Sequence, residues 1–149
     1  MKSPIRIVKG FFRLNSNNKK IFVEAYVLSV IISILVEIIP FKWLAGKLGR
    51  HMMETTFENN TETDKTARWT GALIYKAVSF IPWKIKCLTQ AVTAKFILRK
   101  RGIASTLYLG VKKSESKKLE AHAWLRVGNE IVTGKEVHKE FTVVSYFGE

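Results

Sequence analysis

The sequence predicts an α+β fold in which helices come first and an antiparallel sheet follows. Two observations support this prediction. Before Gly102 the apolar residues recur with helical spacing, and after Gly102 they alternate with polar residues as on strands. The 149 residues are also 47% hydrophobic and 25% charged, which is enough for a domain with a sizeable core.

The strongest apolar segment covers residues 17–41 and predicts a long helix that ends at Pro40. Its uncharged stretch, Ala25–Val36, is bracketed by Glu24 and Glu37. A helix that spans a membrane needs about 20 apolar residues, and a carboxylate inside the bilayer is costly. The uncharged stretch is therefore short for a simple span.

Three interpretations of this helix remain open. A helix that is buried or faces a partner is favoured on length. A membrane-associated helix is the second, because Lys19 and Lys20 would suit an anionic leaflet. A cleaved signal peptide is the third, although no small-residue cleavage site follows. After Pro40, residues 41–49 predict a short second helix that ends at Gly49.

Residues 50–66 change character and predict a linker, because they are polar and rich in Thr, Asn and Glu. His51, within this stretch, is expected on the surface. The chain is thus expected to divide into residues 1–65, a helical region with its linker, and residues 66–149, a second domain.

The second domain is expected to open with two helices. Residues 67–80 predict the first, which ends before Pro82. The next begins near Lys86, and its apolar positions form one stripe at the spacing of a helix face. The members of this stripe are Cys87, Ala91, Ala94 and Leu98. Basic residues in the last turn and Gly102 beyond it are typical of a helix C-terminus.

Four strands are then expected, at residues 103–111, 118–127, 130–133 and 140–147. Residues 128–129, Gly-Asn, predict the tight turn of a hairpin. On the second strand the odd-numbered residues from 119 to 127 are apolar and are expected to face the core. The opposite, polar face carries Glu120, His122, Trp124 and Arg126.

Charge and cysteine content limit the possible functions. Twenty-five Lys and Arg against 12 Asp and Glu give a net charge of +13, which favours nucleic acid, an anionic membrane or an acidic partner. Nucleic-acid binding is disfavoured because the basic residues are scattered without interleaved aromatic residues. One cysteine and three unpaired histidines predict neither a disulfide nor a metal site, and no cofactor is expected. A reducing cytoplasm is the expected setting.

Cys87 and His122 form a candidate nucleophile and base. A thiol at a helix N-terminus gains from the helix dipole, which favours the thiolate. A histidine on a strand could accept the thiol proton if the fold brings it near. The alternatives are a packing cysteine and a surface histidine. Trp83 and Trp124 are expected either to line the same pocket or to be core aromatics.

Three motifs in order, PWKIKCLTQAVTAKFILRKRGI, LYLGV and AHAWLRV, resemble the transglutaminase-like cysteine peptidases of lasso-peptide biosynthesis. The resemblance is close over roughly residues 66–149, and residues 22–49 also look like the helical region of that family. The separation of 35 residues between Cys87 and His122 fits it. The matching residues are Trp83, Cys87, Leu88, Ala91, Arg101, Gly102, Ile103, Leu107, Gly110, Val111, His122, Ala123 and Trp124.

The resemblance implies a transglutaminase-like or papain-like core, with the cysteine at a helix N-terminus packed against an antiparallel sheet that carries the histidine. It implies removal of the leader from a ribosomally made precursor peptide through an acyl-enzyme on Cys87. A stand-alone peptidase of this kind implies a separate leader-recognition protein as partner, and the macrocyclising synthetase as another. The alternatives are an acyltransferase of transglutaminase type and a membrane-associated binding or scaffold protein with an inert cysteine.

The sequence departs from the family at the third catalytic position. The family commonly has an aspartate twelve residues after the histidine, where this chain has Gly134. Another group must then orient the imidazole ring. The candidates are Asn129, Glu130, Thr133 and Glu136, a backbone carbonyl, or water.

Overall fold

The computed structural model describes residues 9–58 and 60–149 and confirms the α+β class. The helices are α2 (Ser16–Ile38), α3 (Phe41–Ala45), α4 (Thr61–Val78), α5 (Cys87–Lys100) and the short 3₁₀ helix η1 (His138–Glu140). The strands are β1 (Arg50–His51), β2 (Thr106–Lys113), β3 (Leu119–Val127), β4 (Glu130–Thr133) and β5 (Thr142–Gly148).

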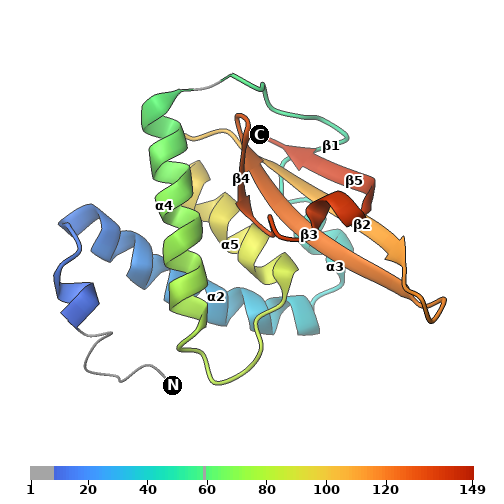
Figure 1. Ribbon diagram of the computed structural model, residues 1–149, viewed down its shortest axis with the longest axis horizontal. Helices are drawn as coiled ribbons and strands as arrows, with labels where there is room; N and C mark the ends of the chain where they lie inside the picture. The colour runs from blue at the N-terminus through green and yellow to red at the C-terminus, as the bar shows by residue number, and fades with distance from the viewer. Residues whose placement is uncertain (1–8, 59) are drawn as a thin grey trace.

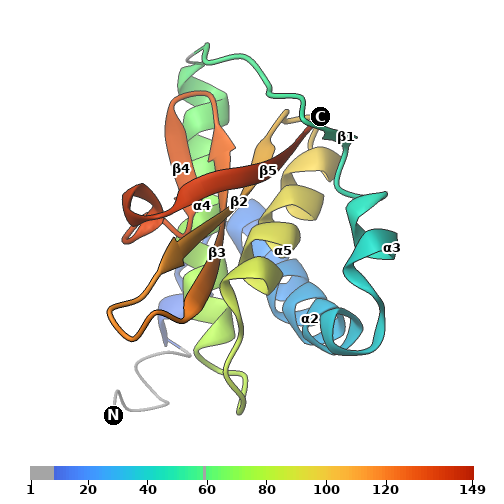
Figure 2. The same ribbon diagram turned by 90° about the vertical axis from the view of Figure 1, so that its right-hand side faces the viewer.

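Within the described residues the five strands form one antiparallel sheet in the order β1-β5-β2-β3-β4. Helices α4 and α5 pack on one face of this sheet, and α2 packs on those two helices. The helices therefore lie on the same side, with α3 near the β1–β5 edge (Figures 1 and 2).

One hydrophobic cluster joins the three long helices to the sheet. Helix α2 contributes Ile21, Ala25 and Ile32, which are 0 to 2% exposed. The predicted stripe of α5 is buried as expected, since Ala91, Ala94 and Leu98 are fully inaccessible and Cys87 packs beside them. The first and second halves of the chain thus share a core, and the expected boundary between residues 65 and 66 falls within α4.

The predicted linker is shorter than expected at both ends. Helix α4 already begins at Thr61 because the Asn60 side chain caps it, accepting from the Glu62 amide at 3.1 Å. Acidic residues in the first turn favour the positive end of the helix dipole. At the other end, Arg50 and His51 pair with β5 as strand β1. His51 is exposed as predicted and lies 2.9 Å from the Ser145 hydroxyl.

Helix α2 has the length and apolar composition of a membrane-spanning helix, with a mean hydropathy of 2.3 over its best window. Core helices and signal sequences share these properties, so they do not decide between the three interpretations. The structure adds that one face of α2 is buried against α4 and α5. The opposite face is exposed.

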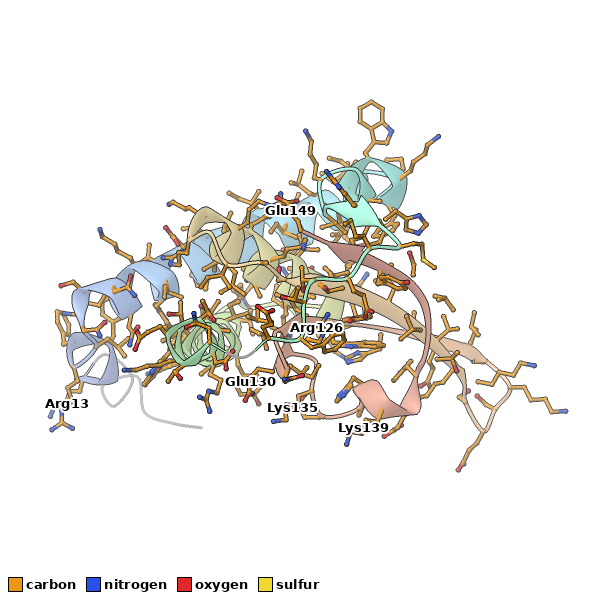
Figure 3. The ribbon with its side chains drawn as sticks, turned by 90° about the horizontal axis from the view of Figure 1, so that it is seen from above. Arg13, Arg126, Glu130, Lys135, Lys139 and Glu149 are labelled. Carbon is orange, nitrogen blue, oxygen red and sulfur yellow. The ribbon has the colours of Figure 1, made fainter. Side chains whose placement is uncertain are left out.

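Strand β3 is buried on both faces from Ala123 to Val127, so the prediction of a polar face was wrong at Trp124 and Arg126. Trp124 and Arg126 are each only 4% exposed. At Arg126 this face is covered by residues 52–58, which cross the sheet: the guanidinium group donates to the carbonyls of Thr55 at 2.8 Å and Thr56 at 3.2 Å. Figure 3 shows Arg126 inside the molecule.

The two ends of the predicted inner face of β3 also differ. Ala123 and Leu125 lie in the core, but Leu119 is 70% exposed. The hairpin formed by β2 and β3 extends beyond the helices (Figure 1), so its tip has nothing to pack against. The alternation of apolar residues therefore predicted the strand but not how far the helices cover it.

Lys95 is a buried cation that connects α5 to the strands. Its ammonium group donates to the Ser105 carbonyl at 2.8 Å and to the Phe147 carbonyl at 3.4 Å, and the residue is 1% exposed. Burial, together with the nearby positive charge of Arg99, lowers the pKa of Lys95 to about 8.

This lowered pKa predicts a pH-dependent stability. Between about pH 8 and pH 10.5 the unfolded chain retains a proton on Lys95 that the folded protein has released. The contribution of this residue to the free energy of unfolding therefore rises with pH in that window. We expect denaturant titrations to show this rise in the wild type relative to Lys95→Met, which lacks the group. Parallel pH curves for the two proteins would contradict the prediction.

Candidate active site

Cys87 is the first residue of α5. The helix begins there because the preceding residues, which include Pro82, are irregular and Lys86 has an extended conformation with φ −71° and ψ 155°. Among the residues that the structure describes, no side chain caps this end. The first backbone N–H groups of a helix have no partner within it. Here no described side chain accepts hydrogen bonds from them as a cap. They make this terminus favourable for a negative charge.

His122 lies on β3, opposite Gly110 of β2. Strand β4 pairs only with residues 125–127 of β3, so β3 is an open edge at His122. The imidazole stacks on Trp124 with 5.9 Å between ring centroids, and it contacts Phe141 in a tilted arrangement with 5.1 Å between centroids. Two aromatic rings therefore fix the position of the imidazole at this edge.

Cys87 and His122 line one cavity of about 650 Å³, where the N-terminus of α5 meets the end of β4. The other lining residues are Gly71, Ala72, Tyr75, Gln90, Ile131, Val132, Thr133, Gly134, Lys135 and Glu136. Gly71 lets α4 approach β4 closely, because a Cβ there would lie 2.2 Å from the Val132 carbonyl oxygen. The fold thus brings the candidate nucleophile and base to the same space.

The third group beside the imidazole is a backbone carbonyl. The Nε2 atom of His122 lies 2.9 Å from the carbonyl oxygen of Gly134. A carbonyl oxygen only accepts, so Nε2 carries a proton, and in the neutral imidazole Nδ1 is then the acceptor. Of the candidate side chains, Thr133 and Glu136 line the cavity, Glu130 does not, and Asn129 donates to the Phe57 carbonyl at 2.9 Å.

Gly134 allows this contact because it has no side chain. Its backbone has φ +73°, a conformation that other residues rarely adopt. A Cβ at this position would lie 2.9 Å from Nε2 of His122 and 2.7 Å from the Ala123 carbonyl oxygen. Glycine at position 134 therefore lets the main chain itself approach the ring.

The two tryptophans lie in different places. Trp124 is buried behind the imidazole, on which it stacks. Trp83 was expected to line the cavity of Cys87 or to be a core aromatic, but it does not line that cavity. It lines a separate cavity of about 410 Å³ beside the C-terminal half of α2 and donates to the Ser33 hydroxyl at 3.2 Å. Neither alternative expected for Trp83 describes it, because the loop before α5 turns its side chain towards α2 and leaves it 46% exposed.

The described residues include no cluster of three or more His, Cys, Asp or Glu side chains that could hold a metal ion. At this cavity the thiol of Cys87 and the imidazole of His122 meet the uncapped backbone amides at the start of α5. Such a set suits nucleophilic attack on a carbonyl carbon, with an acyl group held on sulfur.

Comparison with known proteins agrees with this geometry. The family model of the transglutaminase-like superfamily matches residues 35–146, which include Cys87, His122 and the whole cavity between them. No curated protein and no solved structure matches the chain significantly. Members of the superfamily are typically cysteine-dependent enzymes, which supports an activity of the cysteine protease or acyltransferase type. The chain belongs to the transglutaminase-like superfamily.

Proposed function

We propose that this protein is the leader peptidase of a lasso-peptide pathway, a cysteine peptidase that cleaves a ribosomally made precursor between leader and core. The observation that carries the proposal is the shared cavity of Cys87 and His122 at the N-terminus of α5. The motifs around both residues, which resemble those of the lasso-peptide peptidases, supply the substrate class.

In the proposed reaction, Nδ1 of His122 takes the proton of the Cys87 thiol, and the sulfur attacks the carbonyl carbon of the last leader residue. The Cys87 amide at the helix N-terminus donates to the oxyanion. When the peptide bond breaks, the imidazolium gives its proton to the amine of the core peptide, which leaves. The leader stays on sulfur as a thioester until water, deprotonated by His122, releases it.

The proposal includes partners. The precursor peptide would be presented by a separate leader-recognition protein, and the amine released on the core peptide would then be available to a macrocyclising synthetase. The setting would be the cytoplasm or the cytoplasmic face of a membrane. The positive charge of +13 supports an acidic partner or surface.

The direct test is to incubate the protein with precursor and recognition protein and to weigh the fragments. Hydrolysis at the leader–core junction gives a leader whose new carboxyl group contains the oxygen of water, visible as a mass shift in ¹⁸O-labelled water. A leader that instead gains the mass of an added amine would assign the acyltransferase reaction. An intact precursor, with Cys87 still reactive towards iodoacetamide, would contradict both reactions on this substrate.

Gly134→Ala tests the role of the backbone carbonyl. The added Cβ would push against Nε2 of His122, and a displacement of about 1 Å in a catalytic group can lower the rate on the order of 10²-fold. We expect a loss of that size in kcat and a slower alkylation of Cys87 near neutral pH. Gly102→Ala is the matched control, because Gly102 has φ +69° but no atom within 4 Å of the new Cβ. Equal losses in both variants would contradict the role.

A further inference from the structure

A row of exposed aliphatic side chains runs along α2 on the side away from the core. Its members recur at intervals of three or four residues and therefore lie on one helix face. They are Val23, Val27, Ile31, Ile34 and Ile38, which are 47 to 70% exposed. We call this row the α2 stripe; at 1.5 Å per residue it is about 22 Å long. Tyr26 and Leu35, also exposed, widen it.

The fold holds α2 parallel to the protein surface. On its opposite face Ile21, Ala25, Ser29 and Ile32 are buried against α4 and α5. A transbilayer orientation would pull these side chains out of the shared core. The helix can therefore present its stripe to another surface while the fold stays intact, but it would not cross a membrane without unfolding part of the core.

Positive charge and an aromatic ring flank the stripe. Lys20 lies on the same helix face one turn before Val23, by helical spacing. Beyond the other end, α3 carries the exposed Lys42 and the indole of Trp43, which is 76% exposed. Lysine and tryptophan at the ends of an apolar face are typical of helices that lie in the headgroup region of a bilayer.

The two carboxylates of α2 are both neutralised by cations from elsewhere in the fold. Glu24 pairs with Lys100 at 2.7 Å and with Arg101 at 2.8 Å. Glu37 pairs with Lys86. The repulsion that these acids would exert on an anionic surface is thereby reduced, while the protein as a whole carries a charge of +13.

We propose that the α2 stripe binds the surface of an anionic lipid bilayer, with the axis of α2 parallel to the membrane plane. A protein partner fits less well, because protein interfaces depend on Trp, Tyr and Arg anchors and hydrogen bonds, whereas the five residues that define the stripe are all aliphatic and Tyr26 lies at its margin. In the bound state the stripe enters the boundary of the acyl chains, Trp43 lies at headgroup level, and Lys20 and Lys42 reach lipid phosphates.

Vesicle co-sedimentation tests this inference without any peptidase substrate. The wild type should sediment with vesicles of phosphatidylcholine and phosphatidylglycerol, and less with phosphatidylcholine alone. Ile31→Glu combined with Ile34→Glu should lower the partition coefficient at least about tenfold. Lys20→Gln and Lys42→Gln should each lower it about fivefold, on anionic vesicles only. Val144→Glu is the control, since Val144 is 54% exposed on β5, outside the stripe.

The possible results distinguish a lipid surface from a second copy of the chain or a protein partner at the α2 stripe. An unchanged rate of Cys87 alkylation in the Ile31→Glu/Ile34→Glu variant shows that the fold is intact. Any loss of vesicle binding is then caused by the changed stripe. Failure of the wild type to sediment with anionic vesicles would overturn the proposal. So would a wild-type dimer in light scattering that this variant abolishes, or binding of the recognition protein by the stripe in place of vesicles. None of these results depends on whether the protein cleaves a precursor.

Discussion

Replacing Cys87 by alanine is expected to abolish cleavage of the precursor while leaving the protein folded. The substitution removes only the sulfur atom of a partly buried side chain at the first position of α5. Cys87 is the single cysteine of the chain, so no other thiol could hold the acyl intermediate. We expect the rate to fall by at least about 10⁴-fold, as measured by mass spectrometry of the leader, with an unchanged thermal melting curve.

A combined substitution makes this prediction sharper. If Cys87 and His122 act as one unit, His122→Ala should lower the rate strongly, and the double variant should be no slower than Cys87→Ala alone. A residual rate that falls further in the double variant would mean that the two residues act independently. Undiminished cleavage by Cys87→Ala would remove the proposed mechanism altogether.

Replacing Arg126 by methionine is expected to be the most destabilising change outside the core. The guanidinium group donates to the carbonyls of Thr55 and Gly128 and to the Tyr108 hydroxyl, and it lies 3.7 Å from the Phe57 ring centroid. Methionine keeps most of the volume but leaves these acceptors without their donor. We expect the free energy of unfolding to fall by about 3–5 kcal/mol, as measured by denaturant titration.

Lys86→Met is the matched control for this loss. It removes a cation of similar length, but its ion pair with Glu37 is more than half exposed on both sides, and such surface pairs contribute about 0–1 kcal/mol. Arg126→Met should also make residues 52–58 more susceptible to proteolysis, because they would lose their hydrogen bonds and ring contact with the guanidinium group. A loss below about 1 kcal/mol, similar to the control, would show that the segment is held by other contacts.

The sequence predicted most of what positions the candidate site. The helical spacing that begins at Cys87 and the alternation around His122 are local patterns, so each element could be identified without knowledge of the other. Their meeting in one cavity depends on the fold, and here the order of the motifs and the resemblance to a family supplied what periodicity alone could not.

The wrong predictions have separate physical causes. The start of α4 was recognisable, because Asn60 followed by Glu62 and Asp64 is a normal helix N-terminus. The burial of Arg126 could not be recognised from the sequence, because the residues that cover it come from a segment about 70 positions earlier in the chain. Alternation shows which side chains share a strand face, but not whether another part of the chain covers that face.

The contact between His122 and the Gly134 carbonyl limits what side-chain substitutions can reveal about this site. Alanine substitution changes side chains only, so it can displace the carbonyl group that fixes the tautomer, as in Gly134→Ala, but cannot remove it. An amide-to-ester replacement between Gly134 and Lys135 would weaken that acceptor without altering any side chain. Since a peptide dipole has no net charge, a Cys87–His122 ion pair would also be electrically neutral as a unit, unlike one completed by a carboxylate.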